Sequence, residues 1–233
     1  MSARGRDLLI VAMAAAAIVG AGLEGDGRWL HWLTKPLTTL LIASIAWRAV
    51  PSPDPRYRYA VLAGMGLSCI GDIALMLPFD AFVPGLVAFL LAHLCYIVAF
   101  SAGWRAGRGL LAAAAMLLVF AAVNLAGLLP LLPHDLRIPV VVYVVVLSLM
   151  ATLALARAFL VRGGAGATPL RDASARWAAV GAVLFVASDS VLAWDRFGGG
   201  LPMASLLVLA TYYAAQYAIA RSVQNVGAGV RAD

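Results

Sequence analysis

Two aspartates interrupt otherwise apolar stretches of the chain, and they are the residues best suited to chemistry. Asp72 lies in the run 66–78 (GLSCIGDIALMLP) and Asp189 in the run 182–193 (AVLFVASDSVLA). A carboxylate at membrane depth costs roughly 3 kcal/mol on insertion scales and usually has a function in the interior of a helix bundle. Two acids sharing one cavity favour a protonated group beside an ionised one, which is a general acid and base arrangement. A structural hydrogen bond between helices is the alternative.

Other polar side chains fall at comparable depths on different apolar runs, which indicates a polar cavity around the two acids. His93 and Tyr96 are three residues apart, so they lie on one face of a helix, and Tyr213 and Gln216 repeat that spacing. Taken singly, each is more often a satisfied core residue than a catalyst. The residues that we expect to orient the acids, a water or the substrate are His93, Tyr96, Asn124, Tyr143, Ser188, Tyr213 and Gln216.

Lys35 precedes Pro36 at the start of a further apolar run and adds a cation near the acids' end of the membrane. Proline is favoured in the first turn of a helix, so the sequence predicts Lys35 at a helix N-terminus. Free backbone N–H groups at such a terminus attract anions, and the position suits a phosphate group. An interfacial anchor without a ligand is the alternative.

Several familiar catalytic patterns do not occur in the sequence. It contains no HExxH or CxxC pattern, and Cys69 and Cys95 both fall within apolar runs. We therefore expect no metal site, no organic cofactor and no disulfide. No GxSxG elbow or phosphate-binding loop occurs either, so Ser188 is not expected to act as a nucleophile.

The composition indicates that lipid surrounds these residues. Hydrophobic residues make up 64% of the 233 and charged residues only 12%, with a mean hydropathy of +0.94. Soluble domains are closer to half apolar and one quarter charged, so this chain is expected to be a polytopic membrane protein. The net charge of +6 does not indicate nucleic acid binding, because the basic residues lie between the apolar runs.

Eight apolar runs are long enough to cross a bilayer, which takes roughly 20 residues. The predicted spans are 7–24, 36–51, 57–77, 82–102, 109–130, 137–161, 175–194 and 202–222. Pro36, Pro139 and Pro202 are each expected in the first turn of a span. Of the 17 basic residues, 13 fall on one side of the membrane and only Arg28, Lys35, Arg137 and Arg196 on the other. The positive-inside rule then predicts an all-α bundle of eight transmembrane helices with both termini in the cytoplasm.

The chain is expected to form a single integral membrane domain, 1–233, with a flexible tail at 223–233. Its halves, 1–105 and 106–222, resemble each other weakly, because Gly71-Asp72 and Ser188-Asp189 occupy corresponding third spans. Both halves start in the cytoplasm, so a duplication would give a 4+4 parallel repeat. Chance similarity is an equal alternative.

Several motifs, in order along nearly the whole chain, resemble those of the YhhN-like membrane proteins, a family that includes the lysoplasmalogenases. They are Lys35-Pro36-Leu37-Thr38, Gly71-Asp72 with Leu77-Pro78, Ala92-His93-Leu94-Cys95-Tyr96, Tyr143 in a valine-rich span, Gly181 to Phe185 leading to Ser188-Asp189, and Tyr212-Tyr213-Ala214-Ala215-Gln216.

The resemblance implies a hydrolase of lipid metabolism that cleaves the vinyl ether of a lysoplasmalogen, a lysophospholipid, into a fatty aldehyde and a glycerophospho-ethanolamine or -choline. Such a reaction needs a proton donor for the β-carbon, an anion to stabilise the resulting cation, and a positioned water. We expect Asp72 to be the acid and Asp189 the charge stabiliser and base, although the two roles can be exchanged. Lys35 would hold the headgroup phosphate.

A proton-coupled transporter of a small amphipathic solute is the main alternative, because parallel repeats and polar groups at mid-membrane occur there too. A lipid-binding scaffold is a third reading, in which two buried acids would serve no purpose. The Ala-, Gly- and Arg-rich composition suggests a bacterial cytoplasmic membrane as the location. The sequence does not predict an oligomeric state.

Overall fold

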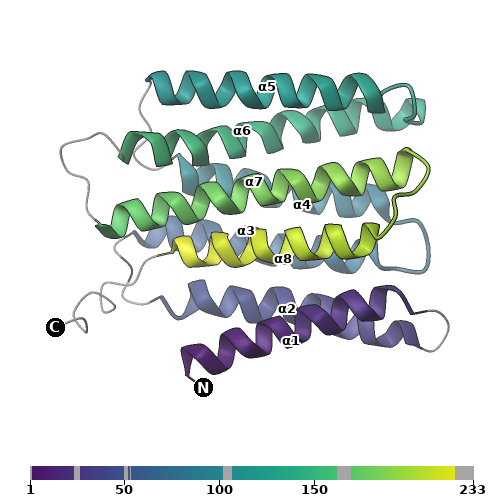
Figure 1. Ribbon diagram of the computed structural model, residues 1–233, viewed down its shortest axis with the longest axis horizontal. Coiled ribbons are helices and arrows are strands. Elements are labelled where there is room, and N and C mark those ends of the chain that lie inside the picture. The colour runs from purple at the N-terminus through teal and green to yellow at the C-terminus, as the bar shows by residue number, and fades with distance from the viewer. Residues whose placement is uncertain are drawn as a thin grey trace.

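The computed structural model describes residues 2–23, 27–49, 52, 54–101, 107–161 and 169–223, and these form an all-helical bundle (Figure 1). The predicted tail lies almost wholly outside the described residues. Within them no strand occurs, and one short 3-10 helix, η2 (His134–Leu136), accompanies the long helices. The eight α-helices are α1 (Ala3–Ala21), α2 (Arg28–Trp47), α3 (Pro55–Leu75), α4 (Phe82–Phe100), α5 (Arg108–Leu128), α6 (Arg137–Val161), α7 (Pro169–Phe197) and α8 (Ala204–Ser222).

The number of long helices agrees with the prediction, but several helix starts do not, and α7 begins at Pro169 rather than at residue 175. α2 begins at Arg28 rather than at residue 36, so Pro36 lies inside the helix and not in its first turn. The missing N–H of Pro36 leaves the Trp32 carbonyl without its helical partner, which a helix within a bundle tolerates. α8 begins at Ala204, after Pro202 and after Met203, whose φ of 57° is left-handed.

Five of the described helices, α3 to α7, are long and apolar enough to cross a membrane. α1, α2 and α8 are not among these five. In α2 and α8 the polar residues that lower the hydropathy, such as Lys35 and Gln216, are buried inside the bundle rather than exposed on its surface. The chain is thus a multi-pass membrane protein, and eight crossings remain a prediction.

All eight helices run along one axis in alternating directions, so α1 begins and α8 ends at the same end of the bundle (Figure 1). Basic residues concentrate at this end, which we call the basic end. Those on its described helices and caps include Arg4, Arg6, Arg48, Arg56, Arg58, Arg108, Arg157, Arg176 and Arg221. The acids discussed above lie toward the opposite end, which we call the cavity end.

Close packing of α3 on α4 fixes the direction in which Asp72 points. The Tyr96 ring of α4 lies directly against Gly64 of α3, where an added Cβ would come within 2.8 Å of three ring carbons. One turn further on, Ser68 is also fully buried. This spacing of small residues allows the two helices to approach along the face that carries Asp72.

We expect Gly64→Ala to lower the free energy of unfolding by about 1–3 kcal/mol, because the new methyl group must displace the buried Tyr96 ring. Thermal unfolding in detergent measures the effect. Gly66→Ala is the matched control, since a Cβ there meets nothing within 4 Å. The control should be neutral or stabilising by up to about 1 kcal/mol. Equal losses in both variants would contradict this account of the packing.

Candidate active site

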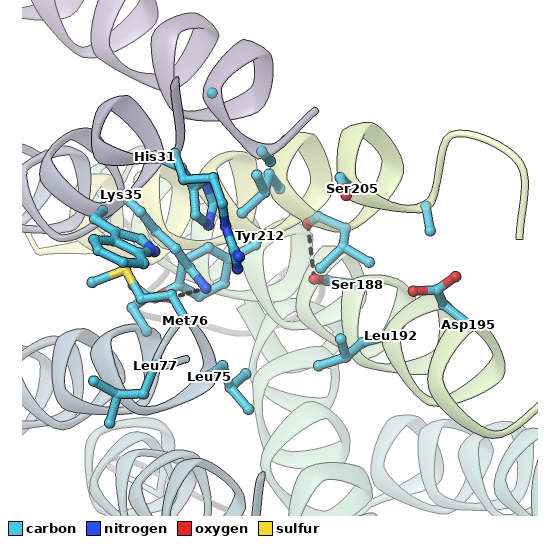
Figure 2. Close-up of a pocket in the computed structure, with 18 of the residues that line it drawn as sticks. His31, Lys35, Leu75, Met76, Leu77, Ser188, Leu192, Asp195, Ser205 and Tyr212 are labelled. Atoms are coloured by element: carbon cyan, nitrogen blue, oxygen red, sulfur yellow. Dashed lines mark hydrogen bonds and ion pairs between the residues drawn. The ribbon is translucent and has the colours of Figure 1, made fainter. Parts of the chain in front are cut away.

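A cavity of about 290 Å³ opens at the cavity end of the bundle, and both aspartates line it. Its wall is built from the adjoining ends of α1, α2, α3, α7 and α8, together with Phe89 of α4. Figure 2 shows His31 and Lys35 on one side of this space, with Ser188, Leu192 and Asp195 on the other. Asp72 and Asp189, more than 100 residues apart in the chain, thus face one shared chamber.

Asp72 is the more enclosed of the two acids, with only 1% of its surface exposed. Its Oδ2 accepts hydrogen bonds from Thr39 Oγ1 at 2.8 Å and from Tyr212 Oη at 2.7 Å. Lys35 Nζ lies 3.6 Å from its Oδ1 and is itself buried. Three donors, one of them cationic, offset part of the cost of burying a carboxylate here.

A chain of buried hydrogen bonds leads from Asp72 toward the middle of the bundle. Gln216 Nε2 donates to Tyr212 Oη at 3.2 Å, and Tyr96 Oη donates to Gln216 Oε1 at 2.9 Å. Tyr96 and Gln216 are fully buried and neither lines the cavity. They therefore hold Tyr212 in place and do not reach the chamber themselves.

Asp189 has fewer partners and retains 14% side-chain exposure. Tyr143 Oη donates to its Oδ2 at 2.6 Å, and His93 Nε2 lies 2.9 Å from the same tyrosine oxygen and 3.5 Å from Oδ2. Because Tyr143 has a single proton, which it gives to Asp189, His93 must donate to it through Nε2. No described residue forms a hydrogen bond with Asp189 Oδ1, which leaves this oxygen for a substrate or a water.

Lys35 does not occupy the predicted helix N-terminus. It is the eighth residue of α2, so the N–H groups near it are engaged in the helix, and its ammonium pairs with Asp72. The predicted helix start was wrong because Pro36 lies within α2 and does not mark its beginning. Arg28, the first residue of α2, and His31 one turn further on line the same cavity with Lys35. The three lie on one face of α2, which carries the positive charges of Arg28 and Lys35 and which we call the basic face.

The remaining predicted residues, Ser188, Tyr213 and Asn124, form no hydrogen bond with either acid. Ser188 lines the cavity, but its hydroxyl donates to the Val208 carbonyl at 3.0 Å. Tyr213 is buried, and its hydroxyl finds no partner within the described part of the chain. Asn124 lies on α5, where its amide binds Trp194 and the Phe120 carbonyl. It lines a second, apolar cavity of about 80 Å³, to which Asp189 also contributes.

Comparison with known proteins places this arrangement in a family. The sequence model of the YhhN family matches residues 30–223, which contain both aspartates and every other site residue named in this section except Arg28. The chain belongs to the YhhN family. The resemblance inferred from the motifs is therefore confirmed.

Relatives of this YhhN-family chain include named enzymes. The human protein "Lysoplasmalogenase TMEM86B" is 37% identical over 201 residues, which make up 85% of this chain and 77% of the relative. A Mycobacterium bovis "Lysoplasmalogenase" is 38% identical over 206 residues, 86% of this chain and 72% of the relative. "Uncharacterized membrane protein YhhN" of Escherichia coli O6:H1 is 38% identical over 93 residues, 40% and 43% of the two chains. No solved structure matches this chain.

Sequence reasoning missed Thr39, Tyr212 and the cavity-facing His31. For the first two a signal was present, because Thr39 is four residues after Lys35 and Tyr212 is four residues before Gln216. Residues four apart share a helix face, so a lysine and a glutamine that were expected at the site place these hydroxyls on the same side. His31 gave no such signal, since its position depends on where α2 begins. Its Nδ1 donates to the Ala17 carbonyl of α1 at 2.9 Å.

Proposed function

We propose that this chain is a lysoplasmalogenase, a membrane hydrolase that cleaves the vinyl ether bond of a lysoplasmalogen into a fatty aldehyde and a glycerophospho-alcohol. The names of the human and mycobacterial relatives support the reaction. The observation that carries it for this chain is that Asp72 and Asp189, on separate helices, line one cavity. Enol ether hydrolysis needs two such groups, as glycoside hydrolysis does.

We assign the proton donor to Asp189 rather than to Asp72. The carboxylate of Asp72 is already engaged by Lys35 and two hydroxyls, whereas the Oδ1 of Asp189 has no hydrogen-bond partner among the described residues and can face the substrate. Asp189 gives its proton to the β-carbon of the vinyl ether, and the positive charge develops on the ether carbon and oxygen. Tyr143 and His93 hold the carboxyl group in orientation. This assignment exchanges the two roles expected from the sequence.

Asp72 completes the reaction as an anion. Its negative charge stabilises the oxocarbenium ion, and it accepts a proton as water adds to the cationic carbon. The product is a hemiacetal, which breaks down to the aldehyde and the glycerol hydroxyl with no net proton consumed. The basic face of α2 supplies positive charge from Arg28 and Lys35 for the headgroup phosphate, and His31 lines the same cavity.

The orientation in the membrane follows from the distribution of charge. We propose that all eight helices cross the cell membrane, with both termini and the basic end in the cytoplasm. The cavity then opens beneath the headgroups of the outer leaflet, where a lysolipid enters with its polar end toward water.

Purified protein in detergent tests the proposal with a 1-alkenyl lysophospholipid as substrate. Release of one aldehyde per glycerophospho-alcohol is the expected result, and the saturated alkyl ether of the same headgroup should give none. If the protein releases no aldehyde from any alkenyl lysolipid, and reconstituted vesicles instead take up the intact lipid, the chain is a transporter and the proposal is wrong.

Tyr143→Phe should lower kcat roughly 10- to 100-fold with little change in KM, because it removes the only hydroxyl among the described residues that donates to Asp189. Steady-state aldehyde release measures both constants. Tyr213→Phe is the matched control, since that hydroxyl has no partner among the described residues, and its kcat should stay near wild type. An unchanged kcat in Tyr143→Phe would remove Tyr143 from the site.

A further inference from the structure

The second cavity, of about 80 Å³, lies beside the first, between α4, α5, α6 and α7. Four side chains line both cavities: Leu75, Phe89, Leu192 and Asp189. These four residues mark the boundary between the two cavities, which we call the neck, and Asp189 is the acid at this boundary. The proposed proton donor therefore stands where a polar chamber meets an apolar one.

The polar side chains around the second cavity are largely engaged with the protein itself. Asn124 uses its Nδ2 on the Phe120 carbonyl and its Oδ1 on Trp194 Nε1. Ser190 donates to the Val186 carbonyl, and Tyr143 donates to Asp189. Most of the remaining lining is aliphatic or aromatic, as in Leu147 and Val144 of α6. Such a cavity offers a polar ligand little and suits a hydrocarbon chain.

The second cavity also reaches the outer surface of the bundle. Phe120, which lines it from α5, is 42% exposed, and its neighbours Val119 and Val123 are more exposed still. α5 packs mainly along α6 and lies at the edge of the bundle (Figure 1). A chain inside the cavity can thus continue into the surrounding lipid past Phe120.

We propose that the second cavity binds the single hydrocarbon chain of the lysolipid and so delivers the vinyl ether bond to Asp189. The inference rests on the proposed function. In a 1-alkenyl lysolipid the double bond is the first bond of the chain, directly after the ether oxygen. With the headgroup in the chamber of the basic face and the chain in the apolar cavity, this bond lies at the neck. A second chain at the glycerol would have to occupy the polar chamber, which accounts for selectivity toward single-chain lipids.

Ala121→Phe tests the chain site, because Ala121 is buried in the lining and a phenyl ring there fills the cavity. We expect kcat/KM for a hexadecenyl substrate, relative to a butenyl one, to fall roughly 5- to 150-fold, the range that overpacking of an apolar site spans. Ala122→Phe is the matched control, since Ala122 is exposed and does not line the cavity. Its ratio should equal that of wild type.

Binding of the non-hydrolysable hexadecyl ether lysophospholipid separates the chain site from catalysis. This probe should raise the thermal midpoint of wild type and of Ala122→Phe, but not that of Ala121→Phe. Val144→Ala, which only enlarges the cavity and loosens its packing on the chain, should lower kcat/KM for the hexadecenyl substrate relative to the butenyl one and serves where Ala121→Phe does not fold. An unchanged chain-length profile in the folded variants overturns the chain site. A wild type that binds the probe but releases no aldehyde overturns the proposed reaction alone.

Discussion

Asp189→Asn should release aldehyde about 10²- to 10⁴-fold more slowly than wild type, the largest loss expected of any single substitution in the cavity. An asparagine keeps the size of the side chain and still accepts the hydrogen bond from Tyr143, but it has no acidic proton for the β-carbon. The affinity for a hexadecyl ether lysophospholipid should change little, because the acidic proton at the neck is not needed to hold the chain. Single-turnover aldehyde release and probe binding measure the two effects separately.

The matched control for this variant is Asp135→Asn, which makes the same chemical change on an exposed acid of η2, outside both cavities. It should keep the wild-type rate. If Asp189→Asn also retained a rate within about threefold of wild type, proton donation by Asp189 would be excluded. Asp72 would then have to donate the proton despite its pairing with Lys35.

The sequence alone was sufficient to find the two acids, because a lone carboxylate in a long apolar run stands out. The same holds for the number of long helices, each of which requires a run of apolar residues. The helix boundaries were less accurate at Pro36, since proline marks a helix start in many proteins but is also tolerated within a helix that its neighbours support. Because of that error the sequence placed Lys35 at a helix terminus, whereas the structure shows it within α2 in a buried ion pair with Asp72.

The partners of each acid could not be predicted in the same way. Asp189 is held by Tyr143 from α6 and by His93 from α4, and these contacts depend on how three helices rotate about their axes. Hydrophobicity indicates poorly which face of a membrane helix points inward when lipid and core are both apolar. Tyr212 and Tyr213 are neighbours in the sequence, but of the two only Tyr212 donates a hydrogen bond to Asp72. Nothing in the sequence favoured one over the other.

Removing one member of the Lys35–Asp72 pair should destabilise the protein more than removing both. Both side chains are buried, with 9% and 2% side-chain exposure, so each single change leaves a charge without its counter-ion. We expect Lys35→Met and Asp72→Asn each to lower the free energy of unfolding by about 3–5 kcal/mol. The double variant should recover most of that loss, yet its aldehyde release should remain as low as that of Asp72→Asn. Unfolding in detergent and the activity assay give the two readouts.

A second ion pair in the same molecule serves as the matched control for this double-mutant cycle. Arg196 and Asp80 are 2.8 Å apart, closer than Lys35 and Asp72, but their side chains are 38% and 71% exposed. Water screens such a pair, so its coupling energy should be at most about 1 kcal/mol. A buried pair with a longer separation should therefore show the larger coupling, because desolvation rather than distance sets the penalty for an unpaired charge. Additive effects at Lys35 and Asp72 would show that the two charges are not energetically coupled. The role of Asp72 as an anion stabilised by Lys35 would then be excluded.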